Sequence, residues 1–259
     1  MAERVMKDAV ITSIVKVTEG IYSMWIKEYE MAALAKAGQF VSLYCQDGSR
    51  LLPRPISICE IDKKQGTLRL VYRVVGKGTE EFSKLNAGEQ IPVMGPLGNG
   101  FYLEGTKVIL IGGGIGIPPM LQLSKELKEK GCQVQIVLGY RDNDLFLKQE
   151  FQPYGEVYVS TEDGSVGTKG NVIDAIKENQ LKADGIFACG PTPMLKGVKA
   201  YGMENRIKTQ LSLEEKMACG IGACLACVCQ SKEKDHHTHV NNKRICKDGP
   251  VFFAEEIEL

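Results

Sequence analysis

Residues Val108-Ile-Leu-Ile-Gly-Gly-Gly-Ile-Gly-Ile-Pro-Pro119 are the most informative segment in the middle of this 259-residue chain. It reads as a short apolar strand, a glycine-rich turn and the start of a helix that continues over residues 119–130. Such a turn can bring backbone N–H groups and a helix N-terminus onto a pyrophosphate. The glycines at 112, 114 and 116 lack the standard G-x-G-x-x-G spacing, so the strand–turn–helix context carries the prediction of a nucleotide site.

Strands and helices alternate downstream of this turn. Apolar strand candidates occupy residues 134–138, 157–159, 186–189 and 207–211, and helix candidates lie near 171–179 and 192–201. This alternation predicts a parallel sheet that is covered by helices on both faces.

A second strand–helix junction, Cys189-Gly-Pro-Thr-Pro-Met194, belongs to the same prediction. Gly190 permits close approach of a ligand, and Cys189 could reach the edge of a nicotinamide; the alternative is a small buried residue. Arg141 could contact a 2′-phosphate, so the residues leave NAD and NADP open. The candidate nucleotide residues are Gly113, Gly114, Gly116, Cys189 and Gly190.

Upstream of the turn, residues 1–103 are rich in short β-branched or alternating runs. Strand candidates occupy residues 21–26, 39–44, 55–59 and 67–75, with glycine and aspartate turn signals between them. This pattern predicts an antiparallel barrel. One helix is expected at residues 79–85, with Thr79 as its N-cap.

The last segment, residues 214–259, has little periodicity and is dominated by cysteine. Cys219, Cys224 and Cys227 have C-x4-C-x2-C spacing, and Cys246 follows further on, which is the plant-type [2Fe–2S] pattern. The small residues between them leave room for a tightly curled loop whose N–H groups approach the sulfurs. The sequence therefore predicts four cluster ligands there.

Other uses of these cysteines are open from the residues alone. Four thiolates can hold zinc, but zinc knuckles usually pair two C-x2-4-C units and the second unit is missing. Four separately buried thiols are the remaining structural alternative. Cys229 is a spare cysteine, and His236, His237 and His239 are expected in a solvated loop.

Composition excludes several classes of partner. The 32 basic and 32 acidic residues cancel and no sustained basic run occurs, so neither nucleic acid nor an anionic membrane is expected as a partner. The first residues lack the apolar core of a secretory signal, and the longest apolar run is too short to span a bilayer. Nine cysteines with a metal pattern favour the reducing cytoplasm over a disulfide framework.

With these motifs in order, the chain resembles the ferredoxin–NADP reductase superfamily and, within it, the electron-transfer subunits of class B, NAD-dependent dihydroorotate dehydrogenases. The position of the cysteine segment after the nucleotide domain, in a chain this short, is the most discriminating feature. The matching motifs are Arg54-Pro-Ile-Ser57, Gly78-Thr79, Gly95-Pro-Leu-Gly98, residues 112–119, Cys189–Met194, Cys219–Cys227 and Cys246-Lys-Asp-Gly-Pro-Val-Phe252.

The resemblance implies an α+β multidomain fold: a β-barrel FAD domain (1–103), an α/β NAD domain (104–213) and a small [2Fe–2S] domain (214–259). It implies that Arg54 neutralises the FAD pyrophosphate and that the Ser57 hydroxyl lies near the isoalloxazine. The FAD residues it implies are Arg54, Pro55, Ile56, Ser57, Val71, Tyr72, Arg73, Gly78 and Thr79. Many relatives carry an aromatic residue where Pro55 and Ile56 stand, so flavin stacking must come from elsewhere.

The implied function is that of an oxidoreductase subunit in pyrimidine biosynthesis. Electrons from dihydroorotate would pass from the FMN of a separate catalytic subunit to the [2Fe–2S] cluster, FAD and NAD, with two copies of each subunit in a heterotetramer. No side chain is expected to act as a catalytic acid or base.

Three alternatives remain at this point. They are a flavin and iron–sulfur subunit of another redox complex, a reductase for an oxygenase, and a zinc-binding interaction module without flavin.

Overall fold

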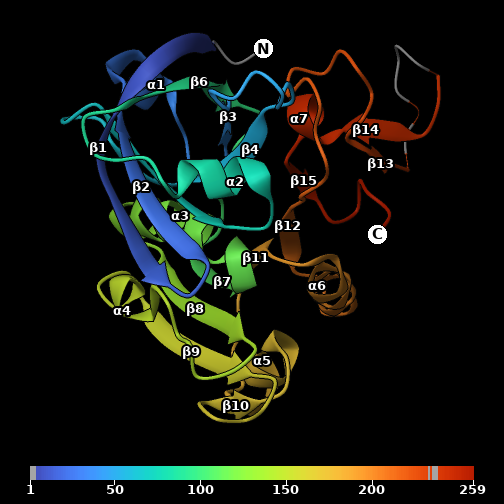
Figure 1. Cartoon of the computed structure of the whole chain (residues 1–259). Coiled ribbons are helices and arrows are strands. Elements are labelled where there is room, and N and C mark those ends of the chain that lie inside the picture. The colour runs from blue at the N-terminus through green and yellow to red at the C-terminus, as the bar shows by residue number, and fades with distance from the viewer. Residues whose placement is uncertain (1–3, 233, 235–238) are drawn as a thin grey trace.

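A closed antiparallel barrel forms the N-terminal part of the chain. The computed structural model describes residues 4–232, 234 and 239–259, and the barrel lies at the blue-to-green end of the ribbon (Figure 1). Its six strands follow the order β1-β2-β5-β4-β3-β6. Their bounds are Val5–Thr18 (β1), Ile21–Lys27 (β2), Phe40–Leu43 (β3), Arg54–Asp62 (β4), Thr67–Arg73 (β5) and Gln90–Leu97 (β6).

The period-two alternation of a strand separates the inside of the barrel from its outside. In β3, Val41 and Leu43 belong to the barrel core, whereas Phe40 belongs to the core formed by the C-terminal half of the chain. Two short helices, α1 (Tyr29–Leu34) and α2 (Lys77–Phe82), also contribute buried residues to the barrel core. Strand β3 therefore contacts both halves of the molecule.

A seven-stranded sheet forms the second part, in the order β10-β9-β8-β7-β11-β12-β15. The strands are parallel except β15, which pairs antiparallel with β12. Their bounds are Lys107–Gly113 (β7), Gln133–Tyr140 (β8), Glu156–Thr161 (β9), Thr168–Lys169 (β10), Gly185–Cys189 (β11), Lys208–Ser212 (β12) and Val251–Phe253 (β15).

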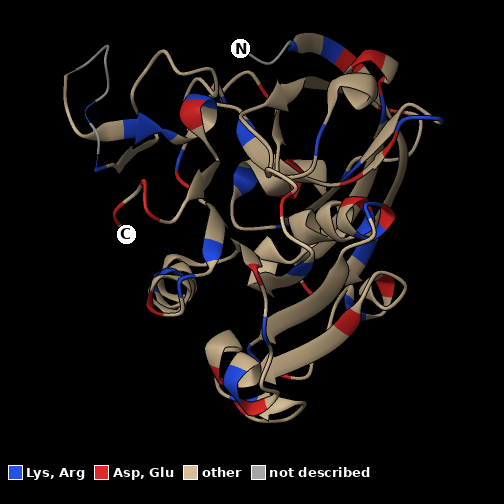
Figure 2. Ribbon diagram, turned by 180° about the vertical axis from the view of Figure 1, so that it is seen from behind, with Lys and Arg blue, Asp and Glu red and all other residues tan. Residues whose placement is uncertain are grey.

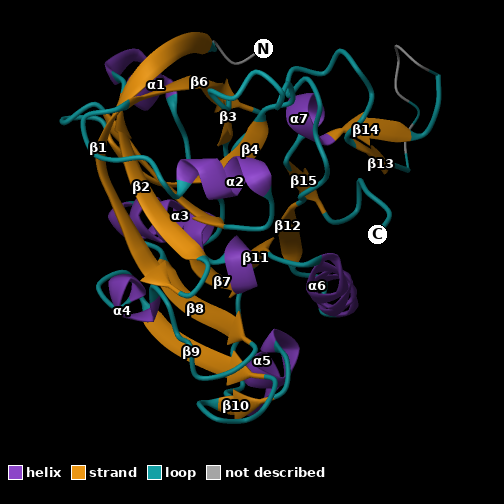
Figure 3. Ribbon diagram, in the orientation of Figure 1, coloured by secondary structure: helices purple, strands orange, loops and turns teal. Residues whose placement is uncertain are grey.

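Helices cover both faces of this sheet (Figure 3). Val108 and Leu110 of β7 pack in the core that contains α3, while Ile109 and Ile111 pack in the core that contains α5 and α6. A strand buried on both faces reads as a continuous apolar run. The helices are α3 (Pro118–Glu129), α4 (Lys148–Phe151), α5 (Val172–Glu178) and α6 (Thr192–Glu204), and the 3₁₀ turn η1 spans Gly114–Gly116.

A half-buried ion-pair network joins the barrel to the sheet domain. Arg69 of β5 pairs with Glu60 of β4, with Nη1 2.6 Å from Oε2, and with Glu150 of α4. Lys125 of α3 pairs with the same Glu60. The Ile61 N–H also donates to Gln122 Oε1 of α3 at 2.9 Å. Helix α3 is thus fixed between barrel and sheet.

The C-terminal segment packs beside the barrel and returns to the sheet. It contains the hairpin strands β13 (Val228–Gln230) and β14 (Asn242–Arg244), helix α7 (Ile245–Asp248) and then β15. In Figure 2, acidic and basic residues are scattered along the ribbon of the barrel, the sheet and this segment. No described helix combines the length and the apolar character that crossing a bilayer requires.

The observed architecture confirms the predicted barrel, the parallel sheet covered on both faces and the separate cysteine segment. The prediction that Thr79 is the N-cap residue of its helix was wrong. Helix α2 begins at Lys77, after Gly76, and Thr79 is its third residue. The Thr79 hydroxyl reaches back and accepts the Gly76 N–H at 3.3 Å, so the threonine caps the helix from inside its first turn.

Candidate functional site

A cavity of about 600 Å³ lies between the barrel and the sheet, and it collects most of the expected flavin residues. It is lined from the barrel by Phe40, Arg54, Pro55, Ile56, Ser57, Val71, Tyr72, Arg73, Val75 and Thr79. It is lined from the other parts by Ile115, Ser212, Leu213, Glu214, Glu215, Lys216, Met217 and Pro250. Residues from β3, β4, β5 and α2 thus meet the glycine turn and the end of β12 across one space.

Arg54 lies at the start of β4 with its guanidinium against Gly78 of α2. A Cβ atom on Gly78 would be 2.4 Å from Arg54 Nε. The absence of a side chain at Gly78 therefore lets the Arg54 side chain pack directly against the backbone of α2. The guanidinium donates to the Leu52 carbonyl, and no carboxylate is paired with it among the described residues. A fixed cation with unused donors suits a phosphate group.

Tyr72 gives the clearest sign that this cavity takes a polar ligand. The ring is buried between Tyr22 and Phe82, and the hydroxyl has no hydrogen-bond partner in the described part of the chain. Burial raises the pKa of Tyr72 well above its usual value, so the phenol keeps its proton. An unpaired buried polar group costs about 1–3 kcal/mol, and a ligand acceptor or donor in the cavity would remove that cost. The residues therefore fit a flavin nucleotide.

Replacing Gly78 with alanine is expected to weaken FAD binding about tenfold while leaving the fold intact. The new Cβ meets the flexible end of Arg54, which can swing aside at little cost to stability, but the guanidinium then leaves its position. Fluorescence titration of the flavin-free protein with FAD measures the affinity. Gly76→Ala is the matched control, because a Cβ on Gly76 meets nothing within 4 Å; equal losses in both variants would contradict the role of Arg54.

The structure also brings the expected nucleotide residues together. Cys189 of β11 pairs in register with Gly112 of β7, so the ends of these two strands are adjacent. A Cβ on Gly116 would be 2.4 Å from the Cys189 carbonyl oxygen, and one on Gly113 would be 2.4 Å from Met194 Sδ. Gly114 has a φ of +52° and open space around it. The turn therefore needs glycine at Gly116 for the approach of the Cys189 backbone, at Gly113 for that of the Met194 side chain, and at Gly114 for its conformation.

Cys189 itself is fully buried and does not line the cavity. Burial raises the pKa of the Cys189 thiol well above its usual value, and the charge of Glu214 adds to this. The cavity wall is formed by other residues, among them Ser57 and, at the end of β12, Ser212.

Sequence reasoning missed the segment Ser212–Met217 as part of the site. This segment lies at the carboxyl end of β12, and parallel sheets bind ligands at the carboxyl ends of their strands. Its position after a predicted strand could therefore have identified it as part of the site. The Glu214 side chain is accessible from the cavity, yet the surrounding protein raises its pKa by desolvation. This segment leads directly from the cavity to Cys219.

The four predicted cysteine ligands gather on one loop and one helix. The Ala223 N–H donates to Cys219 Sγ at 3.3 Å, and the Gly222 N–H donates to Cys246 Sγ at 3.1 Å. The Cys246 N–H donates to Cys227 Sγ at 3.4 Å. Gly220 and Gly222 have φ of +68° and +86°, which lets the loop curl around the sulfurs.

These thiols are arranged as two pairs. Burial raises the pKa of Cys219, but hydrogen bonds from Cys224 and from the Ile221 backbone outweigh it and lower the pKa to about 7. The side-chain hydrogen bond with Cys246 lowers the pKa of Cys227 to about 6 and raises that of Cys246. Two pairs of thiols, each pair in contact, suit two irons that each need two thiolates.

A single zinc ion suits the arrangement less well. Among the described residues, no group of three or more His, Cys, Asp and Glu side chains is placed to hold one ion. Cys229 lies on β13, where it pairs in register with Lys243 of β14, and burial raises the pKa of its thiol to about 11. His236 and His237 lie outside the described residues.

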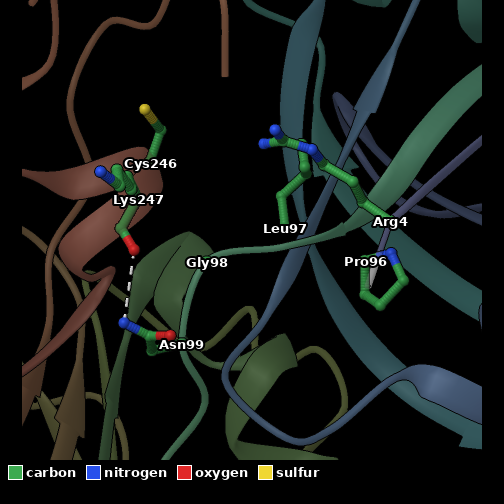
Figure 4. Close-up of a pocket in the computed structure, with 7 residues that line it drawn as sticks. All are labelled: Arg4, Pro96, Leu97, Gly98, Asn99, Cys246 and Lys247. Carbon is green, nitrogen blue, oxygen red and sulfur yellow. Dashed lines mark hydrogen bonds between the residues drawn. The ribbon is translucent and has the colours of Figure 1, made fainter. Parts of the chain in front are cut away.

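A smaller cavity of about 250 Å³ opens beside Cys246 (Figure 4). Asn99 there donates from Nδ2 to the carbonyls of Lys247 and Asp248, at 3.3 and 3.0 Å, and so joins the end of the barrel to α7. Arg4 and Leu97 line the opposite side. The cysteine segment is thus tied to the barrel next to one of its ligands.

Known families match all three parts of the chain. Residues 11–102 match the oxidoreductase FAD-binding domain, and residues 110–200 match the oxidoreductase NAD-binding domain. Residues 214–258 match the iron–sulfur cluster binding domain of dihydroorotate dehydrogenase B. The chain therefore has FAD-binding, NAD-binding and iron–sulfur parts.

Full-length relatives agree with these matches. The chain is 44% identical to the electron transfer subunit of dihydroorotate dehydrogenase B (NAD(+)) of Fusobacterium nucleatum, over 98% of this chain and 99% of that protein. It is 47% identical to the subunit of the same name from Listeria monocytogenes, over 94% and 95%.

Solved structures show the same fold. The structure of an NADH-dependent reduced ferredoxin–NADP oxidoreductase is 33% identical, with a TM-score of 0.86 over 96% of this chain and 89% of that one. A ferredoxin NADP+ reductase from Neisseria gonorrhoeae shares the fold, with 18% identity and a TM-score of 0.65 over 77% and 91%. On the near full-length identity and the matched iron–sulfur domain, the chain belongs to the family of dihydroorotate dehydrogenase B electron transfer subunits.

Proposed function

We propose that this chain transfers electrons from the FMN of a dihydroorotate dehydrogenase catalytic subunit to NAD in pyrimidine biosynthesis. It would do so through a [2Fe–2S] cluster on Cys219, Cys224, Cys227 and Cys246 and through FAD in the 600 Å³ cavity. The observation that carries the proposal is the position of that cavity. It lies between the glycine turn, through Ile115, and Met217, which stands two residues before Cys219.

Each predicted domain would bind one cofactor: FAD in residues 1–103, NAD in residues 104–213 and the cluster in residues 214–259. FAD exchanges electrons in pairs with a nicotinamide and singly with an iron–sulfur cluster, which is why all three sites belong in one subunit. Arg54 would neutralise the pyrophosphate, and Tyr72 and Ser57 would give polar contacts in the cavity. Gly113, Gly114, Gly116 and Gly190 would lie at the NAD site. Gly114 has open space around it, whereas glycine at the other three positions lets Met194 and the Cys189 backbone pack against the turn.

The cysteine loop would also meet the catalytic subunit. Leu225, Val228 and Val240 are exposed apolar side chains in this segment, with 46%, 39% and 49% of their surface accessible. Leu225 stands between two ligands, Cys224 and Cys227. Such side chains beside a cluster support a protein contact there, and a heterotetramer with two of each subunit is the assembly we propose. None of the nine cysteines, all of which lie in the described part of the chain, forms a disulfide, which supports a cytoplasmic location.

Anaerobic purification followed by cofactor analysis tests this function. We expect about one FAD, two irons and two sulfides per chain, and NAD reduction that depends on dihydroorotate once the catalytic subunit is added. Zinc without flavin would overturn the proposal and favour a metal-stabilised interaction module.

A second candidate rests on the 33% identical NADH-dependent reduced ferredoxin–NADP oxidoreductase. A chain of that kind would have the same cofactors but would exchange electrons with a ferredoxin-linked partner. Co-purification separates the two: recovery of a ferredoxin-linked subunit, with no NAD reduction from dihydroorotate, would favour this second candidate.

A further inference from the structure

Ser42 occupies the middle of the strand that separates the flavin cavity from the cysteine loop. Its neighbours Val41 and Leu43 point into the barrel core, so Ser42 and Phe40 point out of the barrel. Phe40 lines the flavin cavity. Ser42, two residues further along the same outer face, lies against Gly220 of the cysteine loop. The outer row of β3 thus runs from the cavity to the cysteine loop.

The Ser42 hydroxyl faces that loop and has no partner. The side chain is fully buried, and Oγ makes no hydrogen bond to any described residue. A Cβ built on Gly220 would be 2.9 Å from Ser42 Oγ and 3.5 Å from Leu97 Cδ1. Gly220 directly follows Cys219, so the hydroxyl lies against the backbone of the loop next to a predicted ligand. Buried hydroxyls are almost always paired, so this one is explained best by an acceptor that belongs to the bound state.

We infer that Ser42 donates a hydrogen bond to a sulfur at the Cys219 end of the iron–sulfur cluster and thereby raises the reduction potential of the cluster. The inference rests on the proposed cluster site. Ser42 is a positioning and tuning residue, because it acts on the cluster and not on a substrate. Ser42 belongs to the FAD domain. The domain that accepts the electron from the cluster therefore also tunes the reduction potential of the cluster.

The physical basis is the charge on the sulfurs. Reduction adds a negative charge to the cluster, so a donor to a sulfur stabilises the reduced form more than the oxidised form. The loop already supplies backbone donors to Cys219 and Cys246 from its own residues. Ser42 adds a donor from outside the loop, and glycine at 220 is what allows the hydroxyl to come close.

The test is an EPR-monitored redox titration of the purified, cluster-loaded subunit. Ser42→Ala should lower the midpoint potential of the cluster. At the potential where half of the wild-type clusters are reduced, clearly less than half of the variant clusters should be reduced. Ser160→Ala is the matched control, because Ser160 is also a buried serine with an unpaired hydroxyl, on β9 of the sheet. Its potential should equal that of the wild type.

Two outcomes overturn the inference. One is an unchanged potential in Ser42→Ala, and the other is an equal shift in Ser160→Ala, which would show a general effect of the substitution. Ser42→Thr keeps a hydroxyl and should stay nearer the wild-type potential than alanine does. A purely structural serine would give the alanine and threonine variants the same potential. Absence of any cluster signal in the wild type would instead contradict the proposed function, so the two failures are distinct.

Discussion

Replacing Cys224 with alanine is expected to abolish NAD reduction by dihydroorotate in the assembled complex. Cys224 contacts Cys219 and forms one of the two thiol pairs, so its loss leaves one iron with a single cysteine ligand. Alanine is preferable to serine, because a serine oxygen can still bind iron. Cys224 is exposed, so the fold should tolerate the change.

The measurement combines the iron and sulfide content with two assays. Dihydroorotate-dependent NAD reduction should fall to background, whereas oxidation of NADH by an artificial acceptor of the flavin should remain, because the cavity and the glycine turn are untouched. Cys229→Ala is the matched control: this thiol lies nearby on β13 but outside the two pairs, and it should keep both the cluster and both activities. Normal flow from dihydroorotate to NAD in Cys224→Ala would rule out the proposed electron path.

Replacing Arg54 with alanine is expected to weaken FAD binding by about 10- to 100-fold. A hydrogen bond between charged groups contributes about 1.5–3 kcal/mol, and each 1.4 kcal/mol is a factor of ten in affinity. Arg54 is held across Gly78 on the cavity wall, with no carboxylate partner among the described residues to compete with a phosphate. Its removal therefore takes away a free cation and leaves no unpaired charge behind.

Flavin content after gel filtration and FAD titration give the size of this effect. Arg54→Lys keeps the charge but not the planar fork, so its affinity should lie between those of the wild type and the alanine variant. Arg141→Ala is the control, because Arg141 follows β8 in the sheet domain and does not line the cavity. Full FAD affinity in Arg54→Ala would show that the phosphate is held elsewhere.

The regular parts of the fold were predictable because buried strands and helices have a clear pattern of apolar residues. Residues 108–111 are apolar on both faces of β7, and the structure covers both faces with helices. The long strand β1 was not assigned, because its burial alternates only around Ala9 and Ile11. Several of its side chains lie on the surface, and polar and apolar residues mix along it, so periodicity alone did not separate it from a loop.

The C-terminal segment was predictable in its chemistry but not in its shape. Cysteine spacing identified the four thiols, because ligand number and loop length are constrained by the metal. The hairpin β13–β14, helix α7 and strand β15 are each only three or four residues long, and nothing in so short a run sets a period. Tertiary contacts decide their conformation.

Site residues that belong to a sequence motif were predictable. Site residues that only the arrangement of the strands brings to the site were not. Arg54, Tyr72 and the glycine turn belong to motifs, and the structure brings the first two onto one cavity wall with Ile115 of the turn. Glu214 and Ser42 belong to none. Their places follow from the end of β12 and from the outer face of β3, which exist only once the two domains are packed together.

The pairing of β15 with β12 has a consequence for how the subunit is made. Strand β15 comes after all four cluster cysteines in the chain, yet it forms the edge of the sheet next to β12. During synthesis, the ribosome releases Cys246 before this edge can close, and β12 stays open to mispairing until then. Binding of the cluster by its fourth cysteine and completion of this sheet edge therefore both wait for the last few residues of the chain to emerge.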